Sequence, residues 1–316
     1  MRITVLAGGV GAARFLRGLR AAVPDADITV IGNTGDDFAP FGLHVSPDLD
    51  TVMYTLGGGI SEEQGWGRDG ESHAVLGELA AYGAGPGWFG LGDKDIATHI
   101  LRTQLLSAGQ PLSAVTRRLC ERWQPGVTLL PMSDDPVRTH VFVELDGREQ
   151  DLDFQEWWVR LHAAVPARRI EAVGAARARP APGVLAAIGD ADFVLFPPSN
   201  PVVSIGVILA VPGIADAVRA KTVIGVSPII GGAPVRGMAD ACLTAIGVET
   251  SAIAVAAHYG SGLLDGWLVD DQDKDAVDAP ELAGLAVRSR PLYMTSVATA
   301  AEIARAAVEL ALEVRR

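Results

Sequence analysis

The sequence predicts an α/β protein: a Rossmann-like, mostly parallel sheet with helices on both faces and an inserted, largely helical subdomain that caps it. Three observations support this prediction. A strand–turn–helix–strand pattern opens the chain over residues 2–32, later apolar runs of strand length end in polar loops, and the stretch between them is rich in Gly- and Trp-containing loops. We therefore expect a core of residues 1–60 and 186–316, with residues 61–185 inserted into it.

The first unit carries the most informative pattern. A strand over residues 2–7 runs into Gly8-Gly9-Val10-Gly11, and helix-forming residues follow to about residue 22. Glycine lets backbone N–H groups approach an anion closely, and the helix N-terminus behind them carries partial positive charge. The turn therefore predicts a phosphate site. Its spacing completes neither the dinucleotide fingerprint nor a P-loop, so a tight corner without a ligand is the alternative.

The second strand, at residues 28–32, ends in Asn33-Thr34-Gly35-Asp36-Asp37. This polar loop lies at the carboxyl end of a predicted parallel strand, which is the edge where open α/β sheets bind ligands. Residues 46–51 then predict the start of a helix, with Ser46 as its N-cap and a proline in the first helical position. We expect the loop and the helix start on the ligand side of the sheet.

Four aspartates fall in these two segments: Asp36, Asp37, Asp48 and Asp50. In the simplest interpretation, Asp48 and Asp50 complement the dipole of the helix they begin. Carboxylate oxygens are also the preferred ligands of a hard divalent cation such as Mg²⁺, which would offset the charge of a diphosphate. One of these carboxylates could instead accept the proton of an attacking hydroxyl.

Residues 61–185 contain three helical patterns and one hairpin, at about 71–82, 95–108, 112–122 and 141–148, the hairpin with an Asp-Gly type I′ turn. Gly92-Asp93-Lys94-Asp95 precedes the second helix, and its glycine would let that helix start approach a ligand. A solvated helix start is the alternative. His99 and Arg102, three residues apart, could share the ligand-facing side, although a lone histidine more often packs in the interior.

Residues 154–158, Phe-Gln-Glu-Trp-Trp, concentrate aromatic side chains in a chain with only 6% of them. Core packing is the default interpretation of such a cluster. An aromatic platform for a flat heterocycle is the alternative.

The C-terminal part continues the alternation of strands and helices. We expect strands at residues 193–196, 222–226, 266–269 and 285–288, and helices at 236–246, 250–258 and 297–314, the last of them capped near Thr295 or Ser296. Ser199-Asn200 and Ser227 follow two of these strands and offer donors and acceptors at the edge of the sheet. Several polar loops at the ends of neighbouring strands favour a nucleotide site.

Composition limits the classes of function. The formal charge of −12 argues against a nucleic-acid surface, which needs a basic face. No apolar run is long enough to span a bilayer, and the N-terminus begins a strand, so we expect a cytoplasmic protein without a membrane partner. Cys120 and Cys242 are expected to be buried free thiols.

Several segments, in this order, resemble one family. They are residues 8–11, 33–37, 46–51, 91–99, 131–137, 154–158, 198–206 and 227–232. The family is that of the 2-phospho-L-lactate transferases (CofD in archaea, FbiA in actinobacteria), which build the deazaflavin coenzyme F-420. The resemblance covers about residues 1–300, and the composition looks more actinobacterial than archaeal.

The resemblance implies a Mg²⁺-dependent transfer. The donor would be a guanosine diphosphate ester of enolpyruvate or lactate, and the acceptor a ribityl hydroxyl of the deazaflavin Fo. GMP would leave, giving dehydro-F-420-0 or F-420-0. Residues 61–185 would bind the acceptor, and the protein would be a homodimer. A non-enzymatic, nucleotide-sugar-binding regulator of related fold is the alternative. A third interpretation, a nicotinamide oxidoreductase, rests on the glycine turn alone.

The resemblance also implies roles for single residues. Asp50, with Asp48, would lie at the acceptor hydroxyl and the metal, with Asp36 and Asp37 as further metal candidates. Fo would contact Asp50 together with Lys94, Asp93, His99 and Trp157, although the family commonly has Arg at the position of Lys94. The nucleotide would contact Gly8, Gly9, Gly11, Asn33, Thr34, Ser199, Asn200, Ser204 and Ser227.

Overall fold

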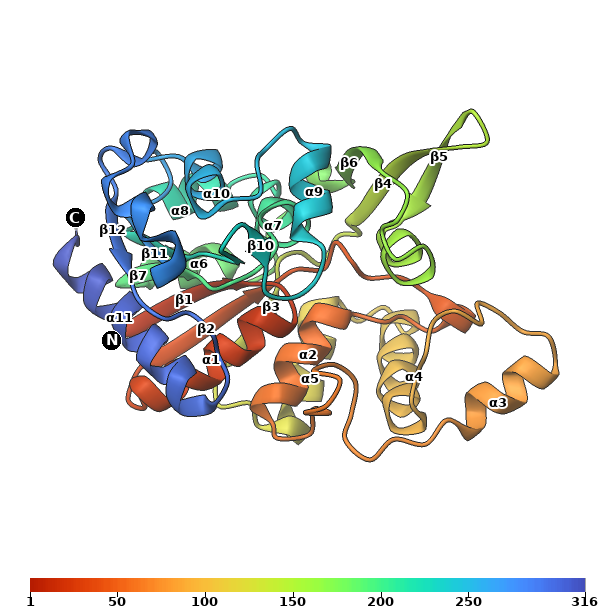
Figure 1. The fold of residues 1–316 in the computed structure, drawn as a ribbon. Coiled ribbons are helices and arrows are strands. Elements are labelled where there is room, and N and C mark those ends of the chain that lie inside the picture. Colours follow the sequence, from red (N-terminus) through yellow and green to blue (C-terminus); the bar gives the residue numbers. More distant parts are fainter. Residues whose placement is uncertain (316) are drawn as a thin grey trace.

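The computed structural model describes residues 1–315 and is built on a seven-stranded sheet in which all neighbouring strands are parallel (Figure 1). The strand order is β12-β11-β8-β7-β1-β2-β3. The strands are β1 (Arg2–Ala7), β2 (Asp27–Gly32), β3 (Thr128–Pro131), β7 (Phe193–Phe196), β8 (Val223–Val226), β11 (Gly266–Val269) and β12 (Ala286–Ser289). The predicted mostly parallel sheet is confirmed.

The strand order reverses beside β1. β2 and β3 continue from β1 on one side, whereas β7 pairs with its other edge and begins the second half of the sheet. Chain connections leave β1 and β7 toward opposite faces, which opens a crevice at the carboxyl ends of these two strands. The topology therefore predicts a ligand site between the glycine turn after β1 and the polar loop after β7.

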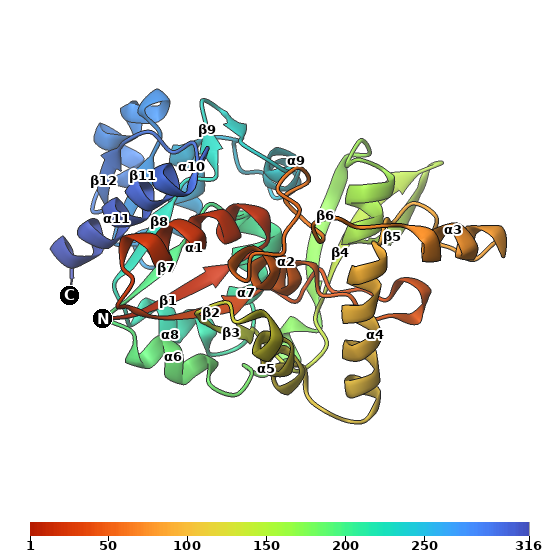
Figure 2. The same ribbon diagram turned by 90° about the horizontal axis from the view of Figure 1, so that it is seen from below.

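Helices cover both faces of the sheet (Figure 2). One hydrophobic core joins the sheet to α1 (Val10–Ala22), α2 (Pro47–Leu56), α5 (Leu112–Trp123) and α11 (Val297–Glu313). A second core on the other face joins it to α6 (Val184–Asp190), α8 (Ile214–Arg219), α9 (Ala239–Ala245) and α10 (Ala252–Tyr259). Alternate side chains of each strand point to opposite faces, so both cores draw on the same strands.

The stretch between β2 and β7 contains more than helices. It holds α3 (Ala74–Ala81), α4 (Asp93–Ser107), a π-helical turn at Glu156–Arg160, and an antiparallel sheet of β4 (Arg138–Leu145), β5 (Arg148–Asp153) and β6 (Ala167–Val173). It also contributes β3, which the sequence analysis did not predict, as the edge strand of the main sheet. Only four residues long, β3 is defined by its pairing with β2 rather than by a local pattern. The division at residues 60 and 186 stays a prediction.

Two local predictions are confirmed in detail. Asp146 and Gly147 both have positive φ, 52° and 72°, as the type I′ turn between β4 and β5 requires. Ser296 caps α11 with a reciprocal pair of hydrogen bonds: its Oγ accepts from the Thr299 N–H, and Thr299 Oγ1 accepts from the Ser296 N–H.

The helix expected at residues 236–246 begins later, at Ala239. The residues before it form the two-stranded hairpin of β9 (Ile229–Ile230) and β10 (Ala233–Pro234), and Gly237 has a φ of +79° that a helix does not allow. The remaining elements are short: α7 (Gly206–Leu209), a π-helical turn at Pro201–Ile205, and 3₁₀ turns at Pro40–Gly42, Ala175–Arg177, Asp271–Asp278 and Pro280–Leu282. Within residues 1–315, no helix is both long and apolar enough to cross a membrane.

The contact between α1 and α11 generates a stability prediction. A Cβ atom on Gly18 would lie 2.3 Å from the backbone carbon of Ala300, so Gly18→Ala should separate the two helices and lower the free energy of unfolding by about 2–3 kcal/mol. Gly77 lies in α3 with nothing within 4 Å of such an atom, so Gly77→Ala should raise it by up to about 1 kcal/mol. Urea unfolding measures both; equal effects would contradict the close packing.

Candidate active site

A cavity of about 1110 Å³ lies at the carboxyl edge of the sheet. Gly9 and Gly11 of the turn after β1, Ser199 and Asn200 of the loop after β7, and Ser227 after β8 all line it. These three strands are consecutive neighbours of one sheet, although residues 11 and 227 are far apart in sequence. The structure thus brings together the polar loops that the sequence placed at strand ends.

Close backbone approach explains the glycines of the turn. A Cβ atom on Gly11 would lie 2.1 Å from the carbonyl oxygen of Pro198, and one on Gly9 would lie 2.6 Å from Oδ1 of Asp48. Any side chain at these positions would push the turn away from the β7 loop or from α2. The glycines therefore set the width of the cavity floor and leave the N-terminus of α1 uncovered.

Side chains of the predicted nucleotide loops shape the loops themselves. Asn200 Oδ1 accepts hydrogen bonds from the N–H groups of Val202 and Val203, at 2.9 and 3.2 Å, and caps the turn that follows. The Gly8 N–H donates to Ser199 Oγ at 3.3 Å, which ties the β1 turn to the β7 loop. Because the Ser199 and Asn200 side chains are used within the loops, a ligand in the cavity would meet mainly backbone groups of these loops and Ser204.

Two of the four aspartates face this cavity, Asp36 and Asp48. Asn33 Nδ2 donates to Asp48 Oδ2 at 3.0 Å and to the Val203 carbonyl at 3.2 Å, so it fixes one of the two carboxylates. Oδ1 of Asp36 is buried and has no hydrogen-bond partner among the described residues. Asn33 and Thr34 are themselves buried and do not line the cavity.

The environment of these carboxylates favours their neutral form or a bound cation. Burial, followed by the charge of Asp48, raises the pKa of Asp36 well above its ordinary value. Burial also raises the pKa of Asp48 to about 7. Two carboxylates that are removed from water and close to each other cannot both remain charged without a compensating positive charge.

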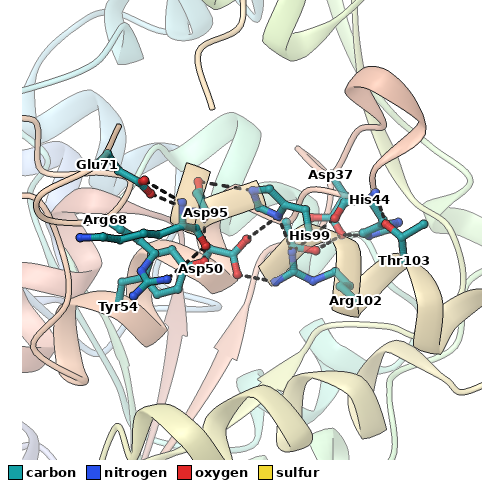
Figure 3. A network of polar contacts seen from close by, with 12 residues as sticks. Asp37, His44, Asp50, Tyr54, Arg68, Glu71, Asp95, His99, Arg102 and Thr103 are labelled. Carbon is teal, nitrogen blue, oxygen red and sulfur yellow. Dashed lines mark hydrogen bonds and ion pairs between the residues drawn. The ribbon is translucent and has the colours of Figure 1, made fainter. Parts of the chain in front are cut away.

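Asp37 and Asp50 point elsewhere (Figure 3). Asp37 Oδ2 accepts from Ser46 Oγ at 2.8 Å and contacts His44 Nε2 at 2.9 Å, so the hydroxyl expected to cap α2 serves this carboxylate instead. Asp50 forms a buried ion pair with Arg102. Asp48 and Asp50 are two residues apart on a helix, about 200° around its axis, and therefore cannot face the same side.

The Asp50–Arg102 pair belongs to a network that fastens α2 to α4 (Figure 3). Arg102 Nη1 lies 3.0 Å from His99 Nδ1, and His99 Nε2 lies 3.3 Å from Asp95 Oδ2. Tyr54, from α2, donates to the same Asp95 carboxylate at 2.7 Å. His99 and Arg102 are at most 1% exposed, so the face of α4 expected to meet a ligand is internal.

Lys94 and Asp93 also lie outside the cavity lining. The Asp93 carboxylate accepts from Ser72 Oγ and from the first N–H groups of α3, at 2.6–3.1 Å, and the Ser72 hydrogen bond is the main cause of its lowered pKa. Glu71 in return accepts from the N–H groups of Lys94 and Asp95 at 2.8 and 2.9 Å. These carboxylates cap each other's helices.

One tryptophan of the aromatic cluster faces the cavity and the other does not. Trp157 is fully buried, and its Nε1 donates to the Val165 carbonyl at 2.8 Å. Trp158 and Phe154, whose ring centroids are 5.2 Å apart, line the cavity. Trp157 and Trp158 are adjacent in the sequence and point in different directions, Trp157 into the interior and Trp158 into the cavity. The flat surface available to a ligand is therefore that of Trp158.

Three arginines in the cavity lining were missed by sequence reasoning: Arg14, Arg17 and Arg236. Arg14 and Arg17 follow Gly11 at helical spacing on α1, a signal that was available in the sequence. Arg236 lies in a loop with no local pattern that would have indicated its position.

Known proteins resemble this chain along its whole length. A family model described as 2-phospho-L-lactate transferase CofD matches residues 3–289. The chain is 68% identical to the phosphoenolpyruvate transferase of Streptomyces griseus, over 100% of both chains, and 56% identical to that of Nocardia farcinica, over 98% of this chain and 95% of the relative. A crystal structure of a UPF0052 family member from Bacillus halodurans shares the fold, with a TM-score of 0.63 at 19% identity over 97% of this chain and 99% of that one.

The buried ion pair predicts a large loss of stability when one partner is removed. Arg102→Met leaves the Asp50 carboxylate buried without a counter-charge and should lower the free energy of unfolding by about 3–5 kcal/mol. Arg118→Met removes an exposed pair with Glu121 and should change it by less than about 1 kcal/mol. Denaturant unfolding compares them; equal losses would contradict the network's role.

The pKa of Asp48 predicts a pH dependence. A raised pKa in the folded state stabilises the fold below pH 4, and this contribution is lost as the pH rises through about 7. In metal-free protein, Asp48→Asn should therefore gain about 4 kcal/mol of stability relative to wild type between pH 4 and pH 8. Asp93, whose pKa is lowered, should give the opposite slope when replaced by Asn. Parallel slopes in chemical unfolding would contradict this assignment.

Proposed function

The chain belongs to the 2-phospho-L-lactate transferase (CofD) family, and on that basis we propose the reaction it catalyses. It transfers a phosphoenolpyruvyl group from its guanosine diphosphate ester to a ribityl hydroxyl of the deazaflavin Fo, releasing GMP. The relatives named phosphoenolpyruvate transferases favour the enolpyruvyl donor over the lactyl one. The product is then dehydro-F-420-0.

One observation carries this proposal: two carboxylates without a counter-charge face a glycine turn in the same cavity. The turn presents the N-terminus of α1, which suits the diphosphate of the donor. Asp36 and Asp48 line the same cavity, and a Cβ atom on Gly9 would lie 2.6 Å from Oδ1 of Asp48. Together these groups suit a substrate that brings phosphate oxygens and a divalent cation.

The donor set fits Mg²⁺. No three His, Cys, Asp or Glu side chains of residues 1–315 are grouped in a way that would hold a metal by themselves. Mg²⁺ commonly takes only one or two carboxylates and completes its octahedron with waters and substrate phosphates. Asp36 and Asp48 would hold it, and Oδ1 of Asp36 makes no hydrogen bond with the described residues that would compete with a cation. When bound, the cation would neutralise charge on the diphosphate.

The reaction needs positioning more than covalent chemistry by the protein. The hydroxyl oxygen of Fo forms a bond to the distal phosphorus, the bond from that phosphorus to the bridging oxygen breaks, and GMP leaves with that oxygen. Asp48, which Asn33 holds in place, is the candidate to accept the hydroxyl proton in the role first expected for Asp50. The wall formed by Trp158 and Phe154 is the candidate surface for the deazaflavin ring.

The proposed reaction is tested by incubating the protein with Fo, Mg²⁺ and the guanosine diphosphate ester of enolpyruvate or of lactate. We expect GMP release, a product of the mass of dehydro-F-420-0, loss of turnover with EDTA and its recovery with added Mg²⁺. Asp48→Asn should lower turnover at least about 100-fold while the circular dichroism spectrum is retained.

A wild-type protein that binds Fo by fluorescence but releases no GMP from either donor would overturn the proposed reaction. Absence of Fo binding would favour the non-enzymatic alternative. Turnover of Asp48→Asn close to wild type would remove this residue from the mechanism.

A further inference from the structure

The positive charge in the cavity is concentrated in one place. Three arginines line it, Arg14, Arg17 and Arg236, and no lysine does so among the described residues. Arg14 and Arg17 come from the face of α1 that also carries Gly11. Arg236 comes from the loop before α9, and its guanidinium interacts with the charge of Arg14.

One of the three arginines already has a counter-charge. Arg17 forms an ion pair with Glu62. Arg14 makes no hydrogen bond or ion pair with any of residues 1–315, although its charge adds to that of Arg17 in lowering the pKa of Glu62. Arg236 donates to a backbone carbonyl, that of Gln64, rather than to a carboxylate. Two guanidinium groups in the cavity therefore lack a bound anion.

Arg14 and Arg236 are close enough to repel each other. Burial, followed by the charge of Arg14, lowers the pKa of Arg236. Gly65 makes the approach of Arg236 possible, because a Cβ atom on Gly65 would lie 2.9 Å from Arg236 Nη1 and 3.3 Å from Val10 Cγ1. An anion between the two guanidinium groups would relieve this repulsion.

We propose that Arg14 and Arg236 form a carboxylate subsite, which holds the carboxylate of the enolpyruvyl or lactyl group during transfer. This inference rests on the proposed function, which supplies a donor with a carboxylate beyond its diphosphate. A guanidinium presents a planar pair of donors that matches a carboxylate in a bidentate contact.

The subsite is distinct from the position expected for the diphosphate. The glycine turn offers N–H groups at the start of α1, and Arg14 lies one turn further along, about 4.5 Å of helix axis beyond Gly11. Asp48 Oδ1 lies against Gly9 of the turn, 2.6 Å from where a Cβ atom would be, and would repel the carboxylate of the donor there. A donor with its phosphates at the turn therefore has its remaining negative charge directed toward the two arginines.

The test compares ligands with and without the carboxylate. GDP carries the diphosphate alone, whereas the guanosine diphosphate esters of lactate and of enolpyruvate carry the carboxylate as well. Isothermal titration with wild type should show tighter binding of the esters than of GDP. Arg14→Gln and Arg236→Gln should each weaken ester binding about 10- to 100-fold and change GDP binding less than about threefold.

Arg17→Gln is the matched control, because Arg17 lines the same cavity from the same helix face but is neutralised by Glu62. Because the freed Glu62 carboxylate also feels the charge of Arg14, Arg17→Gln should weaken the binding of the esters, but less than Arg14→Gln or Arg236→Gln does. Unchanged thermal unfolding of each variant shows that it is folded.

Two results would overturn the subsite: equal weakening of GDP and of the esters, which would assign the arginines to the diphosphate, or unchanged ester binding in both glutamine variants. Either result with a wild-type protein that still releases GMP leaves the proposed function intact. Failure of wild type to release GMP identifies failure of the proposed function itself.

Discussion

The buried ion pair between Asp50 and Arg102 fixes the helix on which the candidate site depends. It joins the first turn of α2 to α4, and through Arg102 it also reaches His99 and the carbonyl of His44. With Asp50 held on this side, the same helical turn presents Asp48 to the cavity, where Asn33 and Gly9 meet it. The buried charge of Asp50 on one face of α2 thereby orients the Asp48 carboxylate on the other face toward the cavity.

The proposed anionic donor poses a local charge problem for an acidic protein, and the cavity addresses it by separating its charges. The helix N-terminus and two arginines supply positive potential on the α1 side. The carboxylates of Asp36 and Asp48 gather where a cation would bridge them to phosphate oxygens. The net charge of −12 is therefore no guide to the potential inside the cavity.

Patterns confined to a few consecutive residues allowed correct prediction of the fold: the glycine turn after β1, the Asp-Gly turn, the Ser296 cap and the strands of the parallel sheet. β3 was not predicted because its four residues carry no strand pattern of their own and are a strand only through their pairing with β2. Side-chain direction was the harder part of the site. The sequence alone does not distinguish Asp48 from Asp50, or Trp157 from Trp158, because each pair is of one residue type. Only tertiary packing decides which member of each pair faces the cavity. Arg236 reaches the α1 arginines across more than two hundred residues of chain.

The crossed caps of α3 and α4 have a consequence for access to the cavity. α3 buries none of its residues completely: Leu76 packs partly buried against a small apolar cluster, and the Asp93 and Glu71 hydrogen bonds join the start of α3 to that of α4. Phe89 and Gly90, which follow α3 in the chain, border the aromatic end of the cavity. Because α3 itself contributes no fully buried residue, we expect this helix to open locally at a lower free energy than global unfolding requires. The segment that contains α3 can therefore move at the edge of the cavity, whereas the glycine turn at Gly11 is held by its close approach to the backbone of Pro198.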